Sequence, residues 1–125
     1  MKQSVKTDKA PTAIGPFSQA IKVGNLVYTS GQVYQSSDGT LIEGTVAEKT
    51  NQIMENLSNV LEAAGASFDN VVKTTIYVTD LIIYAELNKA YSKFLKEPFP
   101  ARETVCVKSL PLGADIEISM VAVVE

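Results

Sequence analysis

The sequence contains no histidine and only one cysteine among its 125 residues. Without histidine, Ser-His and Cys-His nucleophile pairs and His-ligated metal sites are excluded. A single cysteine cannot form an internal disulfide or a thiolate zinc site, and this usage is typical of a reducing cytoplasm. We therefore expect any catalysis to use Arg, Lys, Glu, Asp, Ser, Thr or Tyr side chains, backbone groups and water, with no metal or other cofactor.

Long apolar runs and an excess of positive charge are also missing. No stretch approaches the roughly 20 apolar residues that a membrane span requires, and no apolar segment follows the N-terminal lysines, so neither an anchor nor a secretory signal is expected. The formal net charge is −3, which lacks the basic footprint of a nucleic-acid-binding protein. We expect a cytoplasmic protein with one domain over residues 1–125.

The spacing of apolar residues predicts seven elements in the order β-β-α-β-α-β-β. They span residues 17–23, 26–29, 46–64, 71–79, 83–94, 102–107 and 116–124. Gly24-Asn25 is typical of a two-residue hairpin turn, and Thr45 and Glu48 have the spacing of a capping box at a helix start. With no linker or repeat, this order indicates one α+β domain whose two helices cover one face of the sheet.

The last strand, IEISMVAVV, is apolar on both of its faces. Ile116, Ile118 and Met120 lie on one side, and Val121 and Val123 lie on the other. A strand buried on both faces needs a second cover, which two helices cannot supply. A partner subunit is the favoured cover, and loops of the same chain are the alternative.

Two charged residues could carry chemistry. Arg102 follows PFPA at the start of a strand, and its planar fork binds carboxylates through two parallel hydrogen bonds. Glu117 lies within the most apolar segment, where a carboxyl is either paired or has a raised pKa, and both conditions suit a group that positions water. Taken alone, Arg102 is more simply a solvated or salt-bridged arginine, and Glu117 the structural partner of a cation.

Two further features are weaker. Ser30 and Gly31 end the second strand as TSGQ, where glycine lets a ligand approach the backbone and the hydroxyl can donate or accept. Ser-Gly pairs also form ordinary turns, so both interpretations stay open. Cys106 is interpreted as a small core hydrophobe.

Five segments, AIGPFSQA, TSGQ, EAAGASFDNVVKTTIYVTDL, FPAR and IEIS, run in this order along nearly the whole chain. With these segments the sequence resembles the RidA (YjgF) family. The resemblance implies a chorismate-mutase-like fold with a mixed sheet, a homotrimer, and sites in the clefts between subunits. It also implies hydrolysis of 2-iminopropanoate or 2-iminobutanoate, released by pyridoxal-phosphate-dependent dehydratases, to the keto acid and ammonia.

The resemblance also assigns roles to individual residues. The family's carboxylate-binding arginine falls on Arg102 and its water-positioning glutamate on Glu117, so these are the expected catalytic residues. The expected substrate-binding residues are Phe17, Ser30, Gly31, Thr104 and Arg102 itself.

Three positions depart from the best-known members. Phe17 replaces a tyrosine, which keeps an apolar wall and loses a hydroxyl. After Arg102, Glu103 and Thr104 replace Ser-Cys; the family's contact there resembles a backbone one, which Thr104 can make. Strand alternation should point Glu103 away from Arg102. These changes bear on the substrate range rather than on the fold.

Three functions are therefore weighed. The first is the imine hydrolase, which needs no histidine or metal because free imines already hydrolyse in water and positioning can supply most of the acceleration. The second is a binding protein that senses a keto or amino acid and regulates a partner. The third, a ribonuclease or translation inhibitor, is disfavoured by the net charge of −3.

Overall fold

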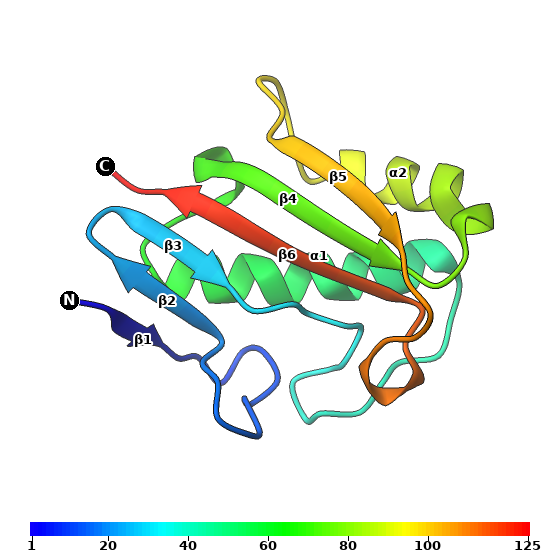
Figure 1. The fold of residues 1–125 in the computed structure, drawn as a ribbon, viewed down its shortest axis with the longest axis horizontal. Helices are drawn as coiled ribbons and strands as arrows, with labels where there is room; N and C mark the ends of the chain where they lie inside the picture. Colours follow the sequence, from blue (N-terminus) through cyan, green and yellow to red (C-terminus); the bar gives the residue numbers. More distant parts are fainter.

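The computed structural model describes residues 1–125 as a six-stranded sheet with two helices on one face (Figure 1). The strands are β1 (Gln3–Val5), β2 (Ala20–Val23), β3 (Leu26–Thr29), β4 (Val71–Val78), β5 (Ala101–Cys106) and β6 (Ile116–Val123). The helices are α1 (Val46–Ala63) and α2 (Tyr84–Ser92), and neither is long and apolar enough to cross a membrane. The sheet order is β1-β2-β3-β6-β4-β5, with only β4 and β5 parallel. The predicted mixed α+β fold is confirmed.

The local signals at the first hairpin and the first helix are confirmed. Gly24, at φ +59°, occupies the two-residue turn between β2 and β3. At the start of α1, the Thr45 hydroxyl accepts from the Glu48 N–H at 3.1 Å, and the Glu48 carboxylate accepts from the Thr45 N–H at 2.9 Å. These two bonds satisfy amides that would otherwise lack partners at the helix start.

The N-terminal part departs from the prediction in two ways. Strand β1 was not predicted, because three residues with only Val5 buried are too short to show alternation. Strand β2 begins at Ala20, three residues later than predicted, because the side chain of Gln19 holds the preceding chain as a loop. Its amide donates to the carbonyls of Thr7 (3.0 Å) and Pro11 (2.8 Å) and accepts from the Thr7 N–H (2.7 Å).

The second helix is shorter than predicted. A 3₁₀ turn, Leu81–Ile83, precedes α2, and its first amide is capped by the Asp80 carboxylate, which accepts from the Ile82 N–H at 3.0 Å. The α-helix then ends at Ser92, two residues before the predicted end. The helix still covers the end of the sheet formed by β4 and β5 (Figure 1).

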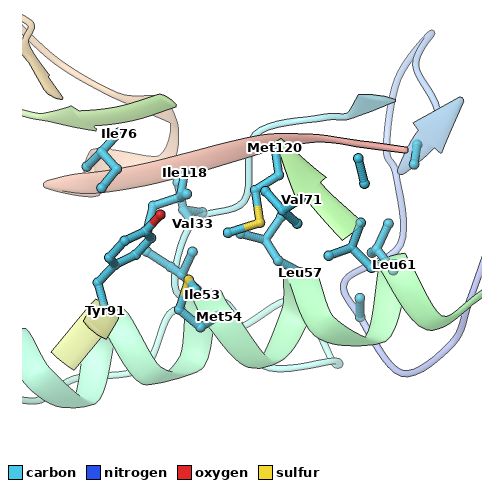
Figure 2. Packing of buried hydrophobic residues seen from close by; sticks show 14 of the residues in the cluster. Val33, Ile53, Met54, Leu57, Leu61, Val71, Ile76, Tyr91, Ile118 and Met120 are labelled. Carbon is cyan, nitrogen blue, oxygen red and sulfur yellow. The ribbon is translucent and has the colours of Figure 1, made fainter. Parts of the chain in front are cut away.

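The core lies between the two helices and one face of the sheet. Ile118 and Met120 of β6 are almost fully buried and point toward Ile53 and Leu57 of α1 (Figure 2). Burying a side chain of this size is worth about 1.5–3 kcal/mol. A one-residue slip of β6 would expose this whole set, so the core determines which face Glu117 occupies.

The other face of the sheet is only partly covered within the chain. Along β6 every second residue is buried, whereas Glu117, Val121 and Val123 are only half-buried. Tyr28, paired with Val121, is 45% exposed. Loops of the same chain therefore cover this face only around Glu117, and cover by a partner subunit stays a prediction.

Cys106 was expected in the core, and this interpretation is wrong. The thiol is exposed because β5 is the last strand of the sheet and has a neighbour on one side only. Apolar spacing within a strand does not show whether that strand lies at the edge.

Candidate functional site

Glu117 lies on the partly covered face of β6, with its carboxyl directly over the backbone of Gly31. A Cβ atom added to Gly31 would lie 2.7 Å from Cδ and 3.0 Å from Cγ of Glu117, distances that real Cβ contacts avoid. Glycine at position 31 therefore allows a close approach of the Glu117 carboxyl, which a Cβ atom would force to move, and no positive φ accounts for it. Its missing side chain creates the space that the Glu117 carboxyl occupies.

The Glu117 carboxyl has no partner within the chain. Burial raises the pKa of this carboxyl above its ordinary value, and no hydrogen bond or neighbouring charge opposes that effect. None of the four salt bridges includes Glu117. The interpretation of Glu117 as a structural ion-pair partner is therefore wrong. A half-buried, unpaired carboxyl of raised pKa is suited to take up and return a proton.

A cavity of about 440 Å³ opens beside this carboxyl, within the size range of small-molecule sites. Glu117 and Gly31 line it together with Phe17, whose ring is 54% exposed. The other lining residues are Pro11, Thr12, Ala13, Ile14, Gln32, Val33, Gln35, Pro111 and Leu112. Three of the predicted site residues thus meet in one cavity, which we call the glutamate half-site.

Ser30 lies next to this cavity without lining it. Its hydroxyl donates to the Ser18 carbonyl at 2.6 Å, and its N–H donates to the Gln19 carbonyl at 2.9 Å. These bonds tie the end of β3 to the segment that carries Phe17. Ser30 thus positions a wall of the half-site, and direct contact between Ser30 and a substrate stays a prediction.

Arg102 lies on the helix-covered side of the sheet, on edge strand β5. Its guanidinium carbon is 5.6 Å from the ring centroid of Tyr84 and 5.2 Å from that of Tyr91, which allows cation–π attraction to both rings. Nη2 donates to the Tyr84 hydroxyl at 2.9 Å. No salt bridge includes Arg102, so the salt-bridge interpretation is wrong. Its remaining N–H groups are free to bind a ligand.

A second cavity, of about 300 Å³, adjoins this guanidinium. We call it the arginine half-site, and it is lined by Asn88, Tyr91, Ser92, Phe99, Pro100 and Arg102. Asn88 Oδ1 and Thr104 Oγ1 are both buried and have no hydrogen-bond partner. Buried polar atoms are rarely left unpaired in native proteins, and a buried water molecule or a small side-chain adjustment would pair these two oxygens.

Tyr84, Asn88 and Tyr91 were not predicted as site residues. They lie at positions i, i+4 and i+7 of α2 and therefore on one helix face. The spacing of two tyrosines and an asparagine indicates a polar and aromatic helix face. That this face belongs to a site follows only from the packing of α2 next to Arg102, which the sequence does not show.

The predicted site residues fall into two groups. Phe17, Gly31 and Glu117 share the glutamate half-site, whereas Arg102 and Thr104 lie on the side of β5 that faces the helices. Alternation along β6 points Glu117 away from the helices. Within one chain the arginine and the glutamate therefore do not meet in a single pocket. No group of three acidic or cysteine side chains is placed to hold a metal ion.

The chain is similar to known proteins of one family. The family model described as Endoribonuclease L-PSP matches residues 7–124. The human protein named 2-iminobutanoate/2-iminopropanoate deaminase is 43% identical over 124 residues, with 98% of this chain and 90% of that protein covered. The chain belongs to the YjgF/RidA family.

Solved RidA-family structures share the whole fold. A RidA from the Antarctic bacterium Psychrobacter has a TM-score of 0.93 and 43% identity, covering 98% of this chain and 99% of that one. TdcF of E. coli, solved with bound serine, has a TM-score of 0.92 and 34% identity, with 98% and 99% covered. The family membership expected from the five segments is confirmed, and so is the fold.

Proposed function

We propose that this RidA-family protein hydrolyses 2-imino acids to 2-keto acids and ammonia, without a cofactor, in sites formed between copies of the chain. The human relative, at 43% identity, is named 2-iminobutanoate/2-iminopropanoate deaminase, and the Arabidopsis thaliana relative, also at 43%, is named Reactive Intermediate Deaminase A. The observation that carries the proposal is the pair of half-sites. One presents a guanidinium that no carboxylate neutralises and the other a carboxyl that no cation or hydrogen bond engages, and these are the two groups that such a reaction needs.

Binding is assigned to the arginine half-site. The Arg102 fork would hold the substrate carboxylate through two parallel hydrogen bonds, with the guanidinium plane kept in place by Tyr84 and Tyr91. The bound serine of E. coli TdcF is consistent with this assignment, because an amino acid carries the same carboxylate and α-carbon.

Chemistry is assigned to Glu117. Its carboxylate takes a proton from a water molecule as the water oxygen bonds to the imine carbon, and it passes that proton to the imine nitrogen to give a carbinolamine. The carbinolamine hydroxyl then loses its proton to the Glu117 carboxylate, which passes it to the amine nitrogen as the C=O bond forms and the C–N bond breaks to release ammonia. Burial favours the protonated form of this carboxyl, so Glu117 readily holds the proton during each transfer from oxygen to nitrogen.

Both assignments require a second chain, because the two half-sites face opposite sides of the sheet. We propose a homotrimer in which the half-sites of neighbouring copies meet. The apolar, partly covered sheet face provides the surface that a neighbour would bury.

Light scattering at micromolar concentration should give about three times the 13.5 kDa chain mass. The physical reason is the partly covered face of β6, which a monomer would leave in water. A monomer that hydrolyses imines would contradict the shared site.

Replacing Gly31 tests the position of the Glu117 carboxyl. Gly31→Ala should lower kcat/KM for imine hydrolysis by at least about tenfold, because the new Cβ displaces the carboxyl from its seat. Gly44→Ala is a matched control: its Cβ would lie 3.1 Å from Cδ of Glu48, a capping residue outside both half-sites. The control should lower the melting temperature and leave kcat/KM unchanged. Equal losses in the two variants would reduce Gly31 to a folding role.

One assay separates the proposed function from its rivals. Threonine dehydratase generates 2-iminobutanoate in solution, and the rate of 2-ketobutyrate appearance is compared with and without the protein. Acceleration supports the hydrolase. Binding of 2-ketobutyrate without acceleration indicates a sensor. Salt-dependent RNA binding favours a ribonuclease, the activity in the description Endoribonuclease L-PSP.

A further inference from the structure

Leu112 has an unusual backbone conformation for its residue type. It is the only non-glycine residue with a positive φ, +63°, and it sits between Pro111 and Gly113 in the turn that leads toward β6. The left-handed region is disfavoured for leucine because its Cβ approaches the following carbonyl, whereas glycine and asparagine adopt it readily. Strain of this kind is concentrated at functional sites. Backbone geometry therefore does not explain why residue 112 is leucine, and we look for the explanation in its side chain.

The Leu112 side chain lies where two other apolar side chains are exposed. Leu112 is 62% exposed, Ile14 86% and Phe17 54%, and all three line the cavity of the glutamate half-site. They come from two separate segments, the loop before β2 and the turn before β6. The cavity therefore combines a polar site, at Glu117 and Gly31, with an apolar rim formed by Ile14, Phe17 and Leu112.

The geometry of the reaction indicates what the rim would contact. The imine carbon carries a carboxylate, a nitrogen and one side chain. The carboxylate is directed to Arg102 of the neighbouring copy, and water attacks from Glu117. The side chain is the remaining substituent, and the apolar rim is the surface of the glutamate half-site that matches it. Each methylene group transferred from water to such a surface is worth about fourfold in kcat/KM.

We propose that Ile14, Phe17 and Leu112 select 2-imino acids with branched aliphatic side chains over 2-iminopropanoate. The inference rests on the proposed function and adds a substrate class to it. Leu112 is the residue that sets this preference, because it places an apolar side chain at the cavity where the left-handed backbone favours glycine or asparagine.

The test compares two imines made in the assay by an L-amino-acid oxidase, one from leucine and one from alanine. The protein should show a kcat/KM at least about tenfold higher for the leucine imine, since three additional carbons contact the rim. Leu112→Asn removes the apolar side chain and suits the left-handed backbone, so the variant should fold. It should lower the leucine-to-alanine ratio of kcat/KM by about tenfold.

A matched control removes an exposed apolar side chain elsewhere. Ile82 is 83% exposed in the turn before α2 and lines neither half-site. Ile82→Asn should leave the ratio unchanged. Light scattering on each variant shows whether oligomerisation is affected.

The outcomes separate this inference from the proposed function. Similar kcat/KM values for the two imines in the unmodified protein would contradict the proposed selectivity of the rim. They would leave the proposed imine hydrolysis unaffected. Equal losses on both imines in Leu112→Asn, with a changed oligomer, would make the rim a subunit contact and also overturn the inference. Absence of hydrolysis with every imine would overturn the proposed function itself.

Discussion

Arg102→Lys should lower kcat/KM for imine hydrolysis about a hundredfold while the protein remains folded and oligomeric. Lysine keeps the positive charge but replaces a planar fork with a single flexible ammonium, which cannot form two parallel bonds to a carboxylate. Losing that geometry in a dry cleft costs on the order of 2–3 kcal/mol. The cation–π contacts with the rings of Tyr84 and Tyr91 weaken as well. The measurement is the coupled assay with 2-iminobutanoate.

The chain offers a reverse exchange as the control. Lys96 forms an exposed ion pair with Asp69 at 3.5 Å, and neither residue lies on the sheet or lines a half-site. Lys96→Arg should leave kcat/KM unchanged, because exposed pairs contribute only about 0–1 kcal/mol and tolerate either cation. An Arg102→Lys variant that is folded, trimeric and fully active would falsify the carboxylate-binding role of Arg102.

Glu117→Gln should have the larger effect on turnover, lowering kcat by about 10²–10⁴-fold with little change in the affinity for the 2-keto acid product. The amide fills the same space over Gly31 but cannot take a proton from water. The exposed Glu55 of α1 supplies a control, and Glu55→Gln should leave kcat unchanged. Unchanged turnover in Glu117→Gln would reassign Glu117 to structure.

The pH dependence gives an independent readout for Glu117. Burial raises the pKa of its carboxyl, so the carboxylate that activates water is lost at a higher pH than for an ordinary glutamate. The rate should therefore fall as the pH drops through this raised pKa, and the remaining activity of Glu117→Gln should lack that limb. The effect on stability has the opposite sign. Because the pKa of Glu117 is raised in the folded state, its ionisation lowers the free energy of unfolding as the pH rises through that pKa. The glutamine variant should thus be at least as stable as the parent at neutral pH.

Much of the fold could be predicted because its signals are local. The Gly24 turn and the capping box of Thr45 and Glu48 each lie within a few residues, and alternation correctly placed Glu117 opposite Ile118. The same alternation pointed Glu103 away from Arg102, as observed. These features depend on neighbours along the chain, which the sequence displays directly.

The division of the site could not be predicted in this way. It depends on β5 lying at the sheet edge and on α2 packing beside Arg102, and both follow from sheet order rather than from spacing. The exposure of Cys106 has the same origin. The contact between the Glu117 carboxyl and the backbone of Gly31 joins residues that are far apart in sequence. The segment TSGQ therefore could not show whether its glycine forms a turn or allows another side chain to approach.

The proposed trimer would also determine how the assembly responds to damage. If each chain lends its arginine to one neighbour and its glutamate to the other, it takes part in two sites at once. One copy that is misfolded or chemically modified would then disable both sites, although its neighbours are intact. Activity in an ageing or partly mutant population should therefore decline faster than the number of native chains.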